Sequence, residues 1–392
     1  MEIKPAERIS QVKPYFFADL EKTIAELDQT GMDIIRLDMG SPDLPPDDFI
    51  IESLVKYARR PDMHGYGKAG GTIQLRTAFA MYYQNRFGVE LDPVKEVLGL
   101  IGSKEGIFNL SQVLINPGDL ILLPDPSYPV YQAGALISQA ETYSMPLLAE
   151  NGFLPDLSKI PEQIAQRAKL MWLNYPNNPT GAIAPYAFFE EAVSFALKYQ
   201  IVIAHDAPYV DVCYDNYVAP SILEVPGSKE LVVEFNSLSK TYNMAGWRVG
   251  VAVGNQDVIS LIRTYKSQLD SSHFRPIMLA AESALLDDQS WIHGRNKVYQ
   301  RRRDIIVKTL ADLGFSVDIP KASLYIWARL PEPWQDSMAF CDMLLKNTGV
   351  SITPGVVYGT SGEGFIRISL VTPVERLLEA MLRMKEWMKA GA

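Results

Sequence analysis

The chain has 392 residues, of which 47% are hydrophobic and 21% charged, a composition typical of a globular protein with a large core. Its 37 Lys and Arg residues against 46 Asp and Glu residues give a net charge of −9. Because phosphate backbones are bound by clustered basic residues, this balance weighs against a nucleic-acid partner and favours small-molecule chemistry.

Cysteine usage and apolar runs limit the cellular setting. Cys213 and Cys341 lie far apart without C-x-x-C neighbours, so neither a disulfide framework nor a zinc knuckle is indicated. The N-terminal sequence MEIKPAERIS lacks the apolar stretch of a secretion signal, and no apolar run is long enough to span a bilayer. The four histidines have no metal-ligand spacing. We therefore expect a cytoplasmic protein with no metal site and no membrane contact.

The first part of the chain contains a proline-rich loop and a glycine-rich stretch. The prolines of SPDLPPDD, residues 41–48, predict a rigid loop where the N-terminal segment meets a large domain. In GYGKAGG, residues 65–71, the glycines match the G-x-G-x-x-G spacing of dinucleotide-binding loops. Such a loop must follow a strand, whereas residues 50–64 are amphipathic with a helical pattern. We conclude that the match is accidental.

From about residue 97 to 254, short apolar runs alternate with longer amphipathic segments, which is typical of parallel βαβ units. The predicted strands lie at residues 97–101, 120–123, 170–173, 201–204, 231–235 and 249–253. A helix is expected over residues 186–199, after a proline that can open it. Beyond residue 254 the helices predicted are 257–269, 275–286 and 291–313, followed by strands near 324–328 and 364–369. This later part predicts a second, smaller α+β domain.

Polar residues follow the predicted strands, where doubly wound sheets bind their ligands. Ser103 and Lys104 lie in GSKEG, a turn that suits a phosphate but that equally forms an ordinary helix cap. Asn178 lies in NYPNNPTG, which is also typical of a simple turn. Asp206 and Tyr209 lie in HDAPY, where the acid is a candidate ligand or an N-cap.

Lys240 is the most informative of these residues. A lone lysine is usually a solvated surface charge, but this one follows an apolar strand and lies between hydroxyl-bearing neighbours, including Ser237 and Ser239. Arg248 follows eight residues later, directly before another apolar run. Such a lysine is placed to be partly desolvated, which lowers its pKa and frees its amine for Schiff-base chemistry.

Six motifs, GSKEG, PDPSYPVY, NYPNNPTG, HDAPY, SLSKTYNMAGWRVG and GFIRISL, together resemble the class I/II aminotransferases, pyridoxal-phosphate enzymes of fold type I. They occur in the family's order and cover the chain from about residue 38 to 370. The resemblance implies an α/β fold, with a mostly parallel doubly wound sheet in a large domain and a smaller α+β domain. We expect an N-terminal arm and part of the small domain at residues 1–45, a cofactor-binding large domain at 46–289 and the small C-terminal domain at 290–392.

The resemblance also implies roles for the residues around the cofactor ring. Lys240 forms the Schiff base with pyridoxal 5′-phosphate and moves a proton between the substrate and the cofactor. Asp206 keeps the pyridine nitrogen protonated. Tyr209 and Asn178 bind the ring's 3′ oxygen, and Tyr128 stacks on the ring face. Lys240, Asp206 and Tyr209 are thus the expected catalytic residues.

Further roles concern the phosphate, the substrate and the partner subunit. The expected phosphate ligands are Ser103, Lys104, Ser237, Ser239 and Arg248. Arg367 of GFIRISL clamps the substrate α-carboxylate beside Gly40 and Asn178, unless it is a structural arginine on its strand. Tyr66 of GYGKAGG reaches the phosphate of a neighbouring subunit, which implies a homodimer. The glycines of this stretch allow the backbone to cross close to its neighbour.

Substrate identity follows less directly. The motifs are closest to the LL-diaminopimelate aminotransferases and related alanine aminotransferases, so we expect amino-group transfer from an amino acid to a 2-oxo acid. KSQLDSSHFRPIM and HDAPY depart from that pattern and are candidates for the entrance that holds the distal part of the substrate. An alanine or aspartate aminotransferase of broader specificity and a pyridoxal-phosphate β-lyase stay open. A non-catalytic cofactor-sensing regulator is disfavoured, because about forty residues before the first motif are too few for a DNA-binding module.

Overall fold

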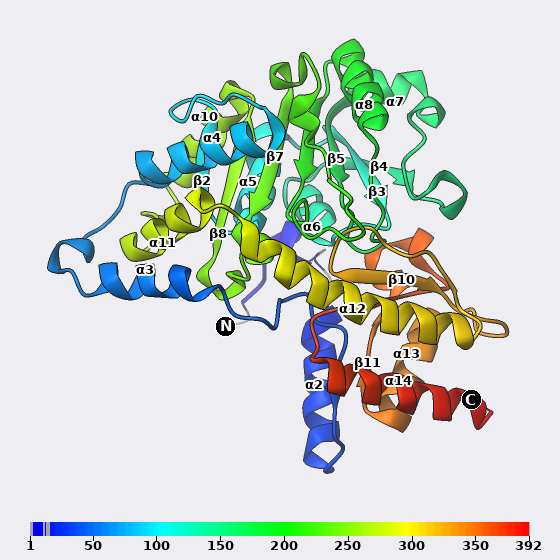
Figure 1. The fold of residues 1–392 in the computed structure, drawn as a ribbon. Coiled ribbons are helices and arrows are strands. Elements are labelled where there is room, and N and C mark those ends of the chain that lie inside the picture. The colour runs from blue at the N-terminus through cyan, green and yellow to red at the C-terminus, as the bar shows by residue number, and fades with distance from the viewer. Residues whose placement is uncertain (1–2, 11, 13–15, 392) are drawn as a thin grey trace.

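The computed structural model describes residues 3–10, 12 and 16–391 (Figure 1). Over these ranges the chain forms a seven-stranded sheet enclosed by helices and a smaller part built on a four-stranded sheet. The long helix α12 (Ser290–Asp312), yellow in Figure 1, runs from one part to the other.

The large sheet has the strand order β2-β8-β7-β6-β5-β3-β4. Its strands are β2 Val97–Ile101, β3 Leu120–Asp125, β4 Glu141–Pro146, β5 Ala168–Asn174, β6 Val202–Asp206, β7 Val232–Ser237 and β8 Val249–Gly254. The six strands predicted here are confirmed, and the sheet is mostly parallel. The edge strand β4 is not among the predictions, because its residues are mostly exposed and form no apolar run.

The direction of β8 differs from the parallel pattern that the sequence predicts. β8 runs antiparallel to both of its neighbours, β2 and β7. Only residues 238–248 connect β7 to β8, which is shorter than the crossover that two parallel strands need. The start of β8, with Arg248 directly before it, therefore lies at the same edge as the carboxyl ends of the parallel strands.

Alternate residues of the inner strands enter two separate hydrophobic cores. In β5, Met171 and Leu173 join one cluster, whereas Leu170 and Trp172 join the other. The first cluster includes residues of α4 (Ile73–Phe87), α8 (Tyr186–Tyr199) and α11 (Arg275–Leu286). The second includes residues of α5 (Ser103–Leu114), α6 (Val130–Ile137) and α10 (Gln256–Lys266). Both faces of the sheet are thus buried under helices, as a doubly wound sheet requires.

The glycine-rich stretch at residues 65–71 contains neither helix nor strand. It follows α3 (Asp48–Ala58) and a short 3₁₀ turn, Pro61–Met63, which confirms that no strand precedes it. The backbone of Gly70 has a φ of +87° and its carbonyl accepts a hydrogen bond of 2.9 Å from the Gly99 amide. A side chain at Gly70 would clash with Leu98, so this glycine permits the close crossing of β2.

The smaller part is α+β, with the sheet order β12-β13-β10-β9 and antiparallel pairing throughout. Its strands are β9 Ser316–Val317, β10 Tyr325–Arg329, β12 Thr353–Pro354 and β13 Phe365–Ser369, and its further helices are α13 Ser337–Thr348 and α14 Val374–Lys389. Near the N-terminus, α1 spans Glu7–Ser10 and α2 Phe16–Gln29. The short strand β1 (Ile35–Arg36) pairs in parallel with β11 (Val350–Ser351), which joins this N-terminal segment to the C-terminal part.

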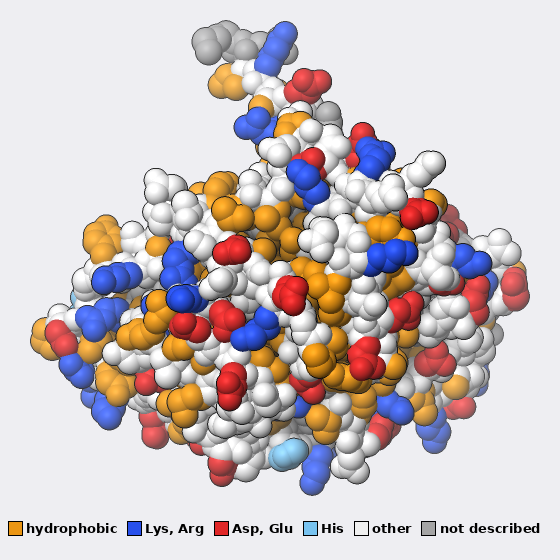
Figure 2. Space-filling model, turned by 90° about the horizontal axis from the view of Figure 1, so that it is seen from above, with side chains coloured by type: hydrophobic (Ala, Val, Ile, Leu, Met, Phe, Trp, Pro, Cys, Tyr) orange, Lys and Arg blue, Asp and Glu red, His pale blue; other side chains and the backbone are white. Residues whose placement is uncertain are grey.

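The surface carries charges of both signs. Figure 2 shows acidic and basic side chains interspersed on one face, without a continuous field of either sign there. In the described ranges, no helix combines the length and apolar character that crossing a bilayer requires.

Candidate active site

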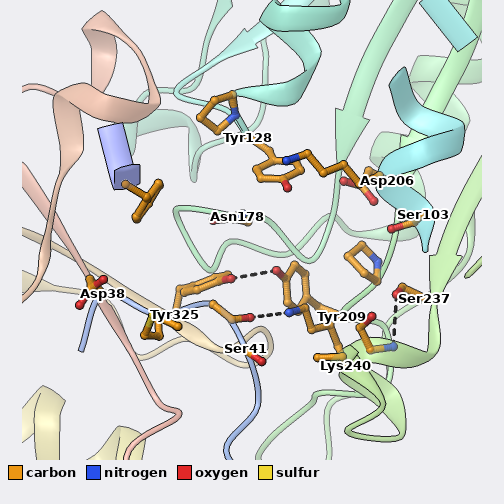
Figure 3. A pocket seen from close by; sticks show the side chains of 18 of the residues that line it. Asp38, Ser41, Ser103, Tyr128, Asn178, Asp206, Tyr209, Ser237, Lys240 and Tyr325 are labelled. Carbon is orange, nitrogen blue, oxygen red and sulfur yellow. Dashed lines mark hydrogen bonds between the residues drawn. The ribbon is translucent and has the colours of Figure 1, made fainter. Parts of the chain in front are cut away.

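A cavity of about 550 Å³ lies where the large sheet, the smaller part and the N-terminal segment meet (Figure 3). The predicted site residues that line it are Gly40, Ser103, Lys104, Tyr128, Asn178, Asp206, Tyr209, Ser237, Ser239, Lys240, Arg248 and Arg367. Tyr66 does not line it, and 97% of its surface is exposed. The fold therefore brings together every predicted site residue except the one expected to serve a partner subunit.

Lys240 lies on α9 (Leu238–Thr241), a four-residue helix directly after β7. The Ser237 hydroxyl caps this helix by accepting a hydrogen bond of 3.2 Å from the Ser239 amide. The Lys240 ammonium donates to the Gly40 carbonyl, as a dashed line in Figure 3 shows. Burial, together with repulsion from Arg248 and Arg367, lowers the pKa of Lys240 to about 8. A useful fraction of this amine is thus uncharged near neutral pH.

Arg295 of α12 holds the turn that carries Lys240. Its buried guanidinium donates to the Lys240 carbonyl at 2.6 Å, to the Thr241 carbonyl and to the Asp211 carbonyl at 2.9 Å. The first two contacts satisfy carbonyl groups that a four-residue helix leaves without intrahelical partners, and the third ties the turn to the loop after β6. The lysine therefore projects from a turn fixed at both ends.

Asp206 ends β6 and is buried. The Tyr131 hydroxyl donates a hydrogen bond of 2.6 Å to its Oδ2 atom, whereas its Oδ1 atom is buried with no hydrogen-bond partner among the described residues. Burial raises the pKa of Asp206 to about 6, and the Tyr131 hydrogen bond opposes that rise. The Tyr131 ring stacks on Trp172 with centroids 4.6 Å apart. One carboxylate oxygen is thus held ready for a donor from the cavity.

Arg367 on β13 is buried among aromatic rings and polar atoms. It donates to Asn178 Oδ1 at 3.0 Å and to the Asp38 carbonyl at 2.7 Å, and it lies 4.1 Å from the Tyr325 ring centroid. The hydroxyls of Tyr209 and Tyr325 are 3.0 Å apart (Figure 3). Arg367 from the smaller part and Asn178 and Tyr209 from loops of the large sheet therefore share one wall of the cavity.

The N-terminus of α5 forms a cationic cup. Gly102 precedes it with a φ of +74°, and a Cβ atom there would clash with the Arg248 guanidinium. Arg248 donates to the Ser239 hydroxyl at 3.5 Å, and burial together with repulsion from Arg248 lowers the pKa of Lys104. The N-terminal end of the helix, hydroxyls and two repelling cations converge here, which suits a phosphate group.

Several cavity residues are not among the sequence predictions: Phe17, Glu21, Arg36, Asp38, Tyr131 and Tyr325 contribute to or support the site. Tyr131 had a local signal, since it lies one helical turn after Tyr128 in PDPSYPVY. The other five residues lie on segments that approach the cavity only in the folded chain, so the sequence gives no local signal for them. No residue of 266–278 lines the cavity of its own chain; the His273 ring donates from Nε2 to the Arg248 carbonyl at 2.7 Å instead.

His205 of HDAPY also lies outside the cavity, because neighbouring residues of a strand point to opposite faces. It contacts Glu234 at 2.8 Å behind the sheet, while Asp206 and Tyr209 of the same motif line the cavity.

These residues fit pyridoxal phosphate by their donor chemistry. The unpartnered Asp206 Oδ1 suits a protonated ring nitrogen, the cup at α5 suits a phosphate, and the partly buried amine of Lys240 suits an aldehyde.

The comparisons with known proteins agree with a pyridoxal-phosphate site. The sequence model of the family described as aminotransferase class I and II matches residues 32–383. An LL-diaminopimelate aminotransferase of Moorella thermoacetica is 48% identical over 383 residues, which cover 98% of each chain, and one of Desulforudis audaxviator is 47% identical with 98% of each chain covered.

Solved structures also match this chain over nearly its whole length. Substrate-bound BacF from Bacillus subtilis is 37% identical with a TM-score of 0.94, and the match covers 99% of this chain and 98% of that one. An aspartate aminotransferase of Thermus thermophilus is 26% identical with a TM-score of 0.92, with coverage of 98% and 100%. The chain therefore belongs to the class I and II aminotransferase family, and it is a pyridoxal-phosphate-dependent aminotransferase of fold type I.

Proposed function

We propose that this enzyme transfers an amino group between LL-diaminopimelate, or a closely related diamino acid, and a 2-oxo acid. The names of its relatives, at 44% to 48% identity over nearly the whole chain, support this substrate class. One observation carries the chemistry: the same cavity holds Lys240, whose pKa is lowered to about 8, and Asp206, whose pKa is raised to about 6. An amine with a pKa this close to neutral pH can take up and release a proton there, and a buried carboxylate in the same cavity suits a protonated ring nitrogen.

Pyridoxal phosphate, when bound, supplies an electron-accepting ring conjugated to the substrate nitrogen. In this proposal the Lys240 amine would take the proton from the substrate Cα and return it to the cofactor carbon on the other side of the substrate nitrogen. Its turn is fixed by Arg295 at one end and by Ser237 at the other, so the amine needs only side-chain rotation to serve both positions.

Four residues would bind the ring. Asp206 Oδ1 accepts the N–H of the ring nitrogen, and the resulting ion pair keeps that nitrogen protonated. Tyr209 and Asn178 bind the ring's 3′ oxygen, and Tyr128 covers one ring face. Each of these side chains is held by the large sheet or its loops, which fixes the ring's tilt.

The phosphate and the substrate would occupy opposite ends of the cavity. Ser103, Lys104, Ser237, Ser239 and Arg248 bind the phosphate. Arg367 binds the substrate α-carboxylate, and the Asn178 and Asp38 contacts hold its guanidinium plane in place. Gly40 lines the cavity and would border the substrate, and a side chain there would clash with the Tyr325 hydroxyl.

We also propose a cytoplasmic homodimer. The exposed Tyr66 has the position expected of a residue that completes a neighbour's phosphate site. A reducing compartment is consistent with two cysteines that form no disulfide with each other.

A half-reaction screen tests the function. Amino acids are added one at a time to the cofactor-loaded protein without a 2-oxo acid, and the visible absorbance of the bound cofactor is followed. We expect LL-diaminopimelate to convert the cofactor to its amine form. Release of ammonia and pyruvate from cystathionine, with no need for a 2-oxo acid, would favour the β-lyase instead.

A further inference from the structure

Three charged side chains line the cavity without a role in holding the cofactor or the substrate α-carboxylate. They are Glu21, Arg36 and Asp38. The other charged residues of the lining are accounted for by the phosphate, the ring nitrogen, the Schiff base and the α-carboxylate. The remaining three charges are therefore the candidates for recognising the far end of a substrate.

Arg36 is bound on two edges of its guanidinium. Asp38, which is fully buried, accepts from Nε and Nη2, each at 2.7 Å. Glu21 of α2 accepts from Nη1 at 3.1 Å and from Nη2 at 2.7 Å. The Glu21 side chain is 55% exposed and Arg36 24%. The inner contact is thus a fixed anchor, whereas the outer contact is open to solvent and replaceable.

Two further contacts tie this ion pair to the substrate site. The Asp38 carbonyl accepts from Arg367 Nη2 at 2.7 Å, so Asp38 holds Arg36 with its side chain and Arg367 with its backbone. Phe17, one helical turn before Glu21 on α2, lies 6.0 Å from the Arg367 guanidinium. A substrate bound to Arg367 therefore has Arg36 and Glu21 within the same cavity.

We propose that Arg36 and Glu21 form the distal subsite and that a zwitterionic group at the far end of the substrate replaces the contact between them. The distal carboxylate takes the outer edge of Arg36, and the distal ammonium binds the Glu21 carboxylate. This inference rests on the proposed function, since a diamino dicarboxylic acid carries such a group at its far end.

Arg36 and Glu21 each keep an oppositely charged partner when the substrate replaces the direct contact between them. The contact between Arg36 and Glu21 is bidentate and partly exposed to solvent, and two charge-assisted hydrogen bonds to the substrate offset its loss. A distal carboxylate alone would face the charge of Glu21 across the subsite. A distal ammonium alone would leave the outer edge of Arg36 without a partner. Only a group with both charges satisfies both residues.

Four substrates separate these contributions. LL-diaminopimelate has both distal charges, L-lysine has only the ammonium, L-2-aminopimelate has only the carboxylate and L-norleucine has neither. The rate constant of the half-reaction at low substrate concentration is measured for each substrate with the wild type, Glu21→Gln and Glu26→Gln. Glu26 is the matched control, because it is exposed on the same helix and does not line the cavity.

We expect Glu21→Gln to slow the reactions of LL-diaminopimelate and L-lysine by about 10- to 100-fold, the range for a hydrogen bond between charged groups. L-norleucine is expected to react within about twofold of the wild-type rate, and L-2-aminopimelate to react faster, because the charge that faces its distal carboxylate is removed. Glu26→Gln is expected to change none of the four.

A second readout avoids turnover. Calorimetry compares LL-diaminopimelate binding to cofactor-loaded Lys240→Ala and to the same variant with Glu21→Gln, and we expect weaker binding by the same factor. An equal loss with all four substrates, or no loss with any, would overturn the subsite while leaving the aminotransferase intact. A wild type that prefers L-norleucine to LL-diaminopimelate would instead overturn the proposed substrate.

Discussion

The Tyr131 hydroxyl lies 2.6 Å from Asp206 Oδ2, and no described residue donates to the other oxygen of that carboxylate. Stacking on Trp172 fixes the Tyr131 ring, which in turn fixes the rotation of the carboxylate. Because one oxygen is taken, the other is the one left for the cofactor's ring nitrogen. Tyr131 is thus a positioning residue that acts through Asp206.

Tyr131→Phe is expected to weaken cofactor binding by about 10-fold or more, because one hydrogen bond to a charged group is lost. Asp206 binds the ring nitrogen as a carboxylate, and its pKa of about 6 places loss of affinity below that pH. The Tyr131 hydrogen bond lowers this pKa, so its removal moves the loss of affinity to higher pH. Titration of the cofactor dissociation constant between about pH 5 and 8 measures both effects.

Tyr175→Phe is the control for this substitution. It also removes a buried hydroxyl, one that donates to the Phe153 carbonyl at 2.7 Å. An unchanged pH profile in Tyr131→Phe, or the same change in both variants, would contradict the positioning role.

The protonation of Lys240 predicts the pH dependence of cofactor loading. Only the neutral amine attacks an aldehyde, and its pKa is lowered to about 8. The second-order rate of loading into the apoprotein is therefore expected to rise about 10-fold per pH unit below pH 8 and to level off above it. Stopped-flow absorbance measures this rate. A rise that continues to pH 10 would show an amine with an ordinary lysine pKa.

Substitution of Glu234, a buried residue of β7, is predicted to lower the stability of the protein. The Glu234 carboxylate is fully buried and accepts from the Tyr83 hydroxyl at 2.8 Å and from the Ser221 hydroxyl at 2.9 Å, and it contacts His205 at 2.8 Å. Glu234→Ala leaves these partners and a cavity behind, so we expect the free energy of unfolding to fall by about 3 to 5 kcal/mol. Urea denaturation of the apoprotein measures it, and the exposed Glu190→Ala should change it by less than about 0.5 kcal/mol.

Tyr66 predicts a contact between subunits. If its hydroxyl binds a partner's phosphate, Tyr66→Phe is expected to weaken cofactor retention by about 5- to 10-fold without unfolding the exposed loop that carries it. Dialysis followed by absorbance measures retention, and sedimentation reports the oligomeric state. Unchanged retention in a dimeric variant would count against the contact.

The sequence predicts the large sheet well because its strands are buried on both faces and appear as continuous apolar runs. It does not predict β4, whose side chains are mostly exposed, or the two-residue pairing of β1 with β11, which is too short for any periodicity. The antiparallel direction of β8 follows from the short connection after β7, a constraint of length and not of residue type. The domain boundaries after residues 45 and 289 stay predictions.

The residues of the active site also divide into those that the sequence predicts and those that it does not. Lys240 and Asp206 could be predicted because the carboxyl ends of strands in a doubly wound sheet converge at one edge. Arg248 precedes β8 and reaches the same edge only because β8 is antiparallel. Arg36 and Glu21 could not be predicted, since α2 and β1 reach the cavity only through pairing with the C-terminal part of the chain. Tyr131 required knowledge of which helix face meets Asp206.

The hydrogen bonds of Arg295 affect how α12 can move. This residue lies near the start of α12 and is tied to the backbone beside Lys240, whereas Arg302, farther along the same helix, binds Asp43 and the Leu370 carbonyl. If the smaller part rotates when substrate binds, the helix acts as a lever whose fulcrum is at Arg295. The lysine is next to that pivot and would move least, whereas residues of the smaller part would move farther the greater their distance from Arg295.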